Sequence, residues 1–213
     1  MSDATLTTTQ QAVLSAADAL ESARDELCRL DAVAGDGDHG LTMAAAARAI
    51  RSEIEHRAPA DLGELTALVA SQFSAVGGSM GALSYVLVEA VGNAVSAEDA
   101  PLSAAQLARL LAAAEDAVSG FGGAKRGDKT IIDAIAPARE AAEQCACQQR
   151  PPAEALLASA AAAEKGAAST AELIARIGRA SRLGERSLGA VDAGATSFAI
   201  VLRALARSYA EET

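Results

Sequence analysis

Aromatic residues are scarce in this chain, which has no Trp, two Tyr and three Phe among 213 residues. Prolines are also few, at five, and the 51% of residues that are hydrophobic are mostly alanine. Strands favour aromatic and β-branched residues, whereas alanine is the best helix former, so this composition argues against a β-sheet protein. The length fits one domain with a full core. We therefore expect a single all-α domain over residues 1–213.

Basic residues are also in short supply. The chain has 18 Lys and Arg against 28 Asp and Glu, a net charge of −10. Binding to nucleic acids or to anionic membranes needs a basic surface, so we expect neither as a partner. The residues after Met1 are polar, unlike a secretory signal, and no stretch is apolar enough to span a bilayer. These absences predict a cytoplasmic protein.

Cysteine is rare too, with only Cys28, Cys145 and Cys147. An odd number without zinc-finger spacing argues against a disulfide framework and favours reduced thiols. The pair Cys145 and Cys147 is a weak alternative signal for a metal or redox site.

The most informative segment is an acidic loop in which Asp31, Asp36 and Asp38 fall within eight residues. Carboxylates this close repel one another, and a hard cation such as Mg²⁺ would keep all three ionised. The spacing fails the EF-hand pattern, which needs glycine where Leu41 stands. A helix expected to begin near His39 would offer free N–H groups to a phosphate. The loop thus predicts a metal and phosphate site, with a solvated turn as the alternative.

The spacing of apolar residues predicts eight helices. Their approximate ranges are 8–30, 40–56, 62–76, 81–95, 103 to a loop at 120–129, 130–148, 152–177 and 195–210. Short loops join antiparallel neighbours, so alternate connections return to the same end of a bundle. The unusual segments 31–40, 77–81, 122–129, 178–185 and 192–194 all fall in such alternate connections. The parity predicts one shared site at one end.

Three of these segments allow two interpretations each. The glycines and the hydroxyl of Ser79 in 77–81 suit either close approach to a ligand or an ordinary turn. Asp128 is expected to cap the helix after it, and Lys129 could instead offset phosphate charge. Arg179 and its basic neighbours could contact a nucleotide or lie on a charged surface. We expect His39 to be a hydrogen-bond donor or structural residue rather than a nucleophile. No Walker or Rossmann motif occurs.

Five segments in order resemble one family, the nucleotide-binding (ADP-binding, L) subunit of bacterial dihydroxyacetone kinase. The same family includes the C-terminal domain of single-chain dihydroxyacetone kinases. The matching segments are Gly35–Gly40, Val76–Gly81, Gly127–Thr130, Gly178–Ser187 and Asp192–Ser197. The resemblance covers nearly the whole chain.

The resemblance implies a barrel of eight antiparallel helices with ADP or ATP bound at one end. It implies that Asp31, Asp36 and Asp38 are ligands of two Mg²⁺ ions. It implies nucleotide contacts at His39, Gly40, Leu41, Thr42, Ser79, Met80, Gly122, Ile131, Arg179, Asp192, Ala193 and Gly194. No catalytic residue is expected in this chain, because the substrate-binding partner subunit of the family supplies the histidine that links to the ketone.

The implied function is transfer of the γ-phosphate of Mg-ATP to a small hydroxyketone held by that partner. The nucleotide is either recharged in place by a phosphocarrier protein of the phosphotransferase system or exchanged with free ATP. Two residues depart from the family pattern: Met80 removes a hydroxyl, and Ala193 replaces a proline, which loosens the backbone there. Another small ketose such as a tetrulose is therefore kept as an alternative. A nucleotide-sensing regulatory module without turnover is a separate alternative. A third, the fatty-acid kinase branch, would need a much longer chain.

Overall fold

The structure is a computed structural model that describes residues 3–95 and 102–212. Within these ranges every regular element is a helix, as the composition predicts. The α-helices are α1 (Asp3–Ser22), α2 (Arg24–Asp31), α3 (His39–Arg57), α4 (Leu62–Val76), α5 (Gly78–Ala94), α6 (Ala104–Gly122), α7 (Ile132–Cys147), α8 (Pro152–Ser169) and α9 (Ala193–Glu212). Two 3₁₀ segments, Thr170–Glu172 and Arg179–Ser187, lie between α8 and α9.

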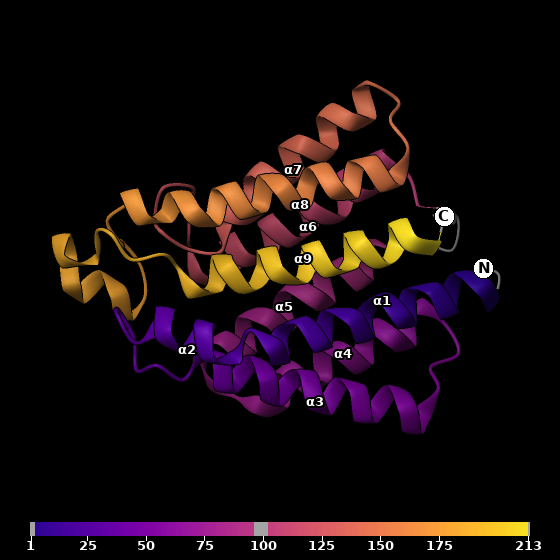
Figure 1. The fold of residues 1–213 in the computed structure, drawn as a ribbon, viewed down its shortest axis with the longest axis horizontal. Coiled ribbons are helices and arrows are strands. Elements are labelled where there is room, and N and C mark those ends of the chain that lie inside the picture. Colours follow the sequence, from indigo (N-terminus) through magenta and orange to yellow (C-terminus); the bar gives the residue numbers. More distant parts are fainter. Residues whose placement is uncertain (1–2, 96–101, 213) are drawn as a thin grey trace.

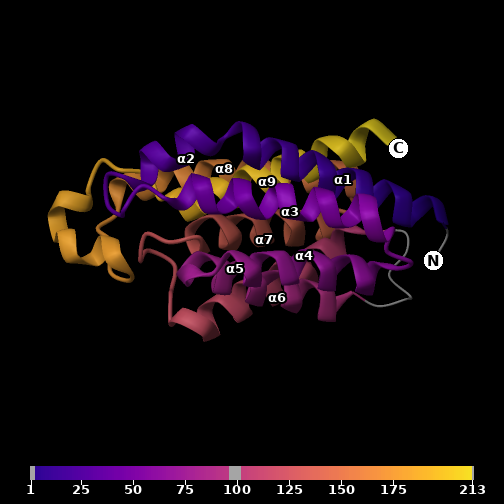
Figure 2. The same ribbon diagram turned by 90° about the horizontal axis from the view of Figure 1, so that it is seen from below.

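The helices form a closed, elongated barrel. Each of α3 to α8 packs on the next helix along the chain, α9 packs on α1, and α1 packs on α3, which closes the ring. Figures 1 and 2 show the helix axes running along the barrel, with the 3₁₀ segments at one end and the start of α1 and the end of α9 at the other. With α1 and its short continuation α2 taken as one, the predicted barrel of eight antiparallel helices is confirmed. No described helix is both long and apolar enough to cross a membrane.

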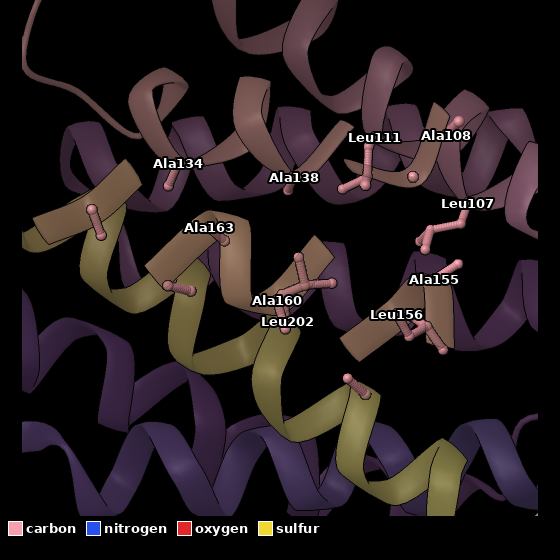
Figure 3. Packing of buried hydrophobic residues seen from close by; sticks show 14 of the residues in the cluster. Leu107, Ala108, Leu111, Ala134, Ala138, Ala155, Leu156, Ala160, Ala163 and Leu202 are labelled. Carbon is pink, nitrogen blue, oxygen red and sulfur yellow. The ribbon is translucent and has the colours of Figure 1, made fainter. Parts of the chain in front are cut away.

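Small side chains let these helices approach closely. In Figure 3, Ala134 and Ala138 of α7 lie near Ala160 and Ala163 of α8, and all four are buried. A Cβ added to Gly166 in α8 would stand 2.1 Å from the Asp133 carbonyl oxygen of α7. Alanine and glycine are thus required by the packing, which explains why bulky aromatic residues are so few.

Helix ends follow the local sequence in several places. The Ser103 side chain accepts from the Gln106 N–H while the Gln106 side chain accepts from the Ser103 N–H, a complete capping box at the start of α6. Gly77, with φ of 69°, separates α4 from α5. Both ends were predicted from the residue types.

Two predicted helices differ from the structure. The first bends at Ala23, where ψ is 0°, and α2 then packs along α3. The helix predicted to reach 177 ends at Ser169. There the Thr170 hydroxyl donates to the Ala167 carbonyl, and the Thr170 carbonyl accepts from the Lys129 ammonium instead of continuing the helix. The contact between Lys129 and Thr170 joins residues 41 positions apart, which periodicity along one segment does not predict.

Candidate functional site

One end of the barrel holds a cavity of about 330 Å³. Its lining comes from the α2–α3 loop, the start of α5, the α6–α7 connection and the segment before α9, the end with the 3₁₀ segments in Figure 1. These are the alternate connections that the helix parity places together. The predicted site residues that line it are Asp31, Asp36, Asp38, His39, Ser79, Met80, Gly122, Ile131, Arg179, Asp192, Ala193 and Gly194.

The acidic loop folds around Asp31. Its Oδ2 accepts hydrogen bonds from the backbone N–H groups of Gly37 at 2.9 Å, Asp38 at 3.1 Å and His39 at 3.4 Å. A Cβ on Gly35 would stand 2.3 Å from Asp31 Oδ1, so the tight loop requires glycine there. The loop thereby turns back on itself, and one carboxylate oxygen each of Asp31, Asp36 and Asp38 lies within 4.8 Å of the others.

The charges in this cluster are incompletely balanced. Arg179, which is 143 residues away in sequence, forms an ion pair with Asp36, and this hydrogen bond lowers the pKa of Asp36. The pKa of Asp38 is raised by desolvation, then by its interactions with Asp36 and Asp31. Asp38 occupies the N-cap position of α3, but its side chain makes no capping hydrogen bond. One guanidinium therefore faces three carboxylates, an arrangement that would attract a cation.

His39 is a buried residue that joins two helices. Its side chain is 4% exposed, and its Nε2 lies 3.1 Å from the Ser197 hydroxyl of α9. Burial lowers the pKa of His39, which keeps the imidazole neutral. The Ser197 hydroxyl in turn donates to the Gly194 carbonyl. A buried, neutral imidazole that is hydrogen-bonded to Ser197 suits a structural residue better than a nucleophile.

Three expected nucleotide contacts lie outside the cavity lining. Gly40 faces α2, where an added Cβ would stand 1.9 Å from the Arg24 carbonyl oxygen. Leu41 is 55% exposed, and the Thr42 N–H donates to the Asp38 carbonyl as part of the first turn of α3. Contact of these three with a nucleotide stays a prediction, and Gly40 has a packing role that the motif alone did not reveal.

The cavity also has apolar walls that sequence reasoning missed: Leu83, Val118, Phe121 and Ile177. Leu83 lies one helical turn after Ser79 on α5, so the helix period could have identified it. No local pattern could have identified Ile177, because the fold of the long segment before α9 brings it to the cavity.

The predicted cap at Asp128 is wrong. Its carboxylate accepts from the Lys125 N–H at 2.8 Å, and α7 begins only at Ile132. Asp133 instead accepts from the backbone N–H groups of Gly127 at 2.6 Å and Thr130 at 2.9 Å, and so fixes this loop. Lys129 does not point its charge at the carboxylate cluster; its ammonium is buried among backbone carbonyls.

Comparison with known sequences identifies the family. The DAK2 domain matches residues 33–207, most of the chain. The chain belongs to the DAK2-domain family. The resemblance drawn from the five ordered motifs is thereby confirmed, since this family includes ADP-binding subunits of dihydroxyacetone kinases.

DAK2-family relatives include stand-alone subunits and parts of longer chains. The chain is 40% identical to the L-erythrulose 1-kinase of Mycolicibacterium smegmatis, over 84% of this chain and 32% of that protein. It is 33% identical to the ADP-binding subunit of the PEP-dependent dihydroxyacetone kinase of Escherichia coli, over 91% of this chain and 92% of that subunit. It therefore spans about a third of the erythrulose kinases it matches and nearly all of the ADP-binding subunit.

The DAK2 fold is also found among solved structures. The crystal structure of the dihydroxyacetone kinase of C. freundii in complex with AMP-PNP and Mg²⁺ matches with a TM-score of 0.71 and 32% identity. The match covers 98% of this chain and 34% of that one.

Proposed function

We propose that this DAK2-family chain is the nucleotide-binding component of a kinase. It would hold Mg-ADP or Mg-ATP at the end of the barrel and deliver the γ-phosphate to a small hydroxyketone held covalently by a partner subunit. The observation that carries this proposal is the placement of three carboxylates and Arg179 at one cavity of about 330 Å³. That volume lies at the lower end of the range typical of small-molecule sites. The nucleotide and Mg²⁺ bound by the C. freundii kinase support it.

Asp31, Asp36 and Asp38 would hold the magnesium. Their donors are hard carboxylate oxygens, which Mg²⁺ prefers, and the exposure of Asp36 and Asp38 leaves room for water and phosphate oxygens. Ligands of one octahedral Mg²⁺ at about 2.1 Å lie at most about 4.2 Å apart. The 4.8 Å spread of the cluster therefore suits a slight contraction around one ion or, as we propose, division between two. Bound magnesium would neutralise phosphate charge.

The other residues would bind and orient the nucleotide. Ser79 and the free N–H groups at the start of α5 offer donors to the phosphates, and Arg179 could exchange Asp36 for a phosphate oxygen. Leu83, Val118 and Ile131 provide apolar walls for the purine ring. Because His39 is neutral and engaged with Ser197, we assign it no proton transfer. This chain would contribute positioning and electrostatics, the main requirements of phosphoryl transfer.

The identity of the acceptor is a separate part of the proposal. Dihydroxyacetone is favoured by the ADP-binding subunits among the relatives, whereas erythrulose kinases match at 38–40% identity and favour a tetrulose. Rates measured with the purified partner subunit on dihydroxyacetone, L-erythrulose and D-erythrulose would decide between them. If the chain binds nucleotide but transfers phosphate to none of these ketoses in the presence of the partner subunit, the nucleotide-sensing alternative is supported.

Thermal unfolding tests the central proposal. The melting temperature would be measured in EDTA, in magnesium, and in magnesium with ADP or ATP. Ligand at about 100 times its dissociation constant adds about 2.7 kcal/mol, which is roughly 5–10 °C for a domain of this size. A shift that needs both magnesium and nucleotide supports the proposal, and no shift at saturating concentrations refutes it.

Whether the nucleotide stays bound between turnovers indicates where the phosphate comes from. We propose that the nucleotide stays bound and is recharged by a phosphocarrier protein, as the name of the PEP-dependent E. coli relative suggests. ADP should then co-purify with the chain, and turnover should require the phosphocarrier. Rapid exchange with free ATP would instead indicate an ATP-dependent kinase.

A further inference from the structure

The segment that carries Arg179 leaves the barrel and returns to it at almost the same place. It spans residues 171–190, and its two ends are joined by a 2.8 Å hydrogen bond from the Gly189 N–H to the Ala171 carbonyl. Figure 1 shows it projecting beyond the end of the barrel, between α8 and α9. We call these joined ends the neck of the segment. Arg179, which forms the ion pair with Asp36, lies within this segment.

Lys129 holds the neck from a different part of the chain. Its ammonium donates to three backbone carbonyls. Those of Thr170 (2.6 Å) and Leu173 (3.2 Å) lie where the chain leaves the barrel, and that of Ala190 (2.5 Å) lies where it returns. These three acceptors match the three donors of an ammonium group. The side chain is 4% exposed, so the charge is withdrawn from solvent and engaged by the neck.

The backbone around Lys129 reinforces this arrangement. Lys129 has a φ of 62°, a left-handed conformation that is unfavourable for a residue with a side chain and persists only where surrounding contacts impose it. The carbonyl of the preceding residue, Asp128, accepts from the Arg176 N–H at 3.1 Å, three residues before Arg179. The α6–α7 connection thus grips the segment both at its neck and next to Arg179.

We propose that Lys129 is a positioning residue for Arg179. By clamping the neck, its ammonium would hold the 171–190 segment so that Arg179 stands over the carboxylates and meets the nucleotide phosphates. This inference rests on the proposed nucleotide site. Lys129 also lines the cavity, but its ammonium is engaged by three carbonyls, so the proposed role acts through the segment and differs from the phosphate contact that the sequence suggested.

A double-mutant cycle tests this coupling. The dissociation constant of Mg-ADP would be measured by calorimetry for the wild type, Lys129→Met, Arg179→Ala and the double variant. Loss of a hydrogen bond to a charged group predicts a roughly 10- to 100-fold weakening for Arg179→Ala. We expect Lys129→Met to weaken binding by about 5- to 50-fold, and by less than about twofold once Arg179 is already absent. Lys125→Met, an exposed lysine in the same connection, is the matched control and should bind as the wild type does.

Trypsin provides a second readout, because the segment contains Arg176, Arg179, Arg182 and Arg186. Lys129→Met should be cleaved at these sites faster than the wild type while the helical circular dichroism signal is retained. If Lys129→Met does not fold, Lys129→Gln, which keeps two side-chain donors, takes its place in the same cycle.

The inference is overturned if the lysine variant weakens binding by the same factor with and without Arg179, or if either single variant binds as tightly as the wild type. Failure of the wild type itself to bind Mg-ADP would refute the proposed function. A wild type that binds, combined with an additive cycle, would refute only the role of Lys129.

Discussion

Replacing Gly40 by alanine should damage both the fold and the carboxylate cluster. The added Cβ would lie 1.9 Å from the Arg24 carbonyl oxygen and 2.8 Å from Cys28 Sγ, both on α2. Restoring an ordinary contact of about 3.4 Å to that oxygen requires α2 to move by about 1.5 Å away from α3. Because Asp31 ends α2, the same movement would displace one of the proposed metal ligands.

The expected magnitude combines two opposing effects. Overpacking at a rigid helix contact costs about 1–3 kcal/mol, and the better helix propensity of alanine returns at most about 1 kcal/mol. We therefore expect a net destabilisation of about 1–2 kcal/mol and a melting temperature lower by roughly 2–8 °C. Affinity for Mg-ADP should fall as well.

Urea denaturation followed by circular dichroism measures the stability change. Gly120→Ala in α6 is the matched control, since nothing beyond the local backbone of α6 lies within 4 Å of its added Cβ, and it should be neutral or slightly stabilising. A Gly40→Ala variant as stable as this control would refute the packing role of Gly40. If Gly40→Ala loses the expected stability but binds Mg-ADP as tightly as the wild type, the link between Gly40 and the metal site is refuted.

Three further changes test separate features. Asp36→Asn should weaken Mg-ADP binding but leave the free energy of unfolding nearly unchanged, because its ion pair with Arg179 is half exposed; collapse of the fold with binding retained would contradict this. Burial raises the pKa of Asp192 to about 6, so the contribution of Asp192 to the stability should fall as pH rises from 4 to 6. Asp192→Asn should remove that dependence and be more stable at pH 8 by up to about 3 kcal/mol, as urea titrations at both pH values would show. Ser103→Ala should cost about 1 kcal/mol and leave Mg-ADP affinity unchanged, since the capping box lies at the start of α6, remote from the cavity.

The features of this protein that depend on local interactions could be predicted from its sequence. Alanine-rich, apolar periodic segments predict helices, and Ser103 and Gly77 mark their ends because capping depends on residues only a few positions away. The closeness of Asp31, Asp36 and Asp38 is also local, since eight residues cannot separate them far. Helix parity then placed four loops at one end.

Other features were decided only by the tertiary structure. Asp36 meets Arg179 across 143 positions, Lys129 finds three carbonyls in a distant segment, and Gly40 is required by the approach of α2 rather than by a ligand. Residue type alone suggested a cap at Asp128 and a phosphate contact at Lys129. Such contacts depend on how separate helices and loops are placed in three dimensions, and periodicity along one helix carries no information about that placement.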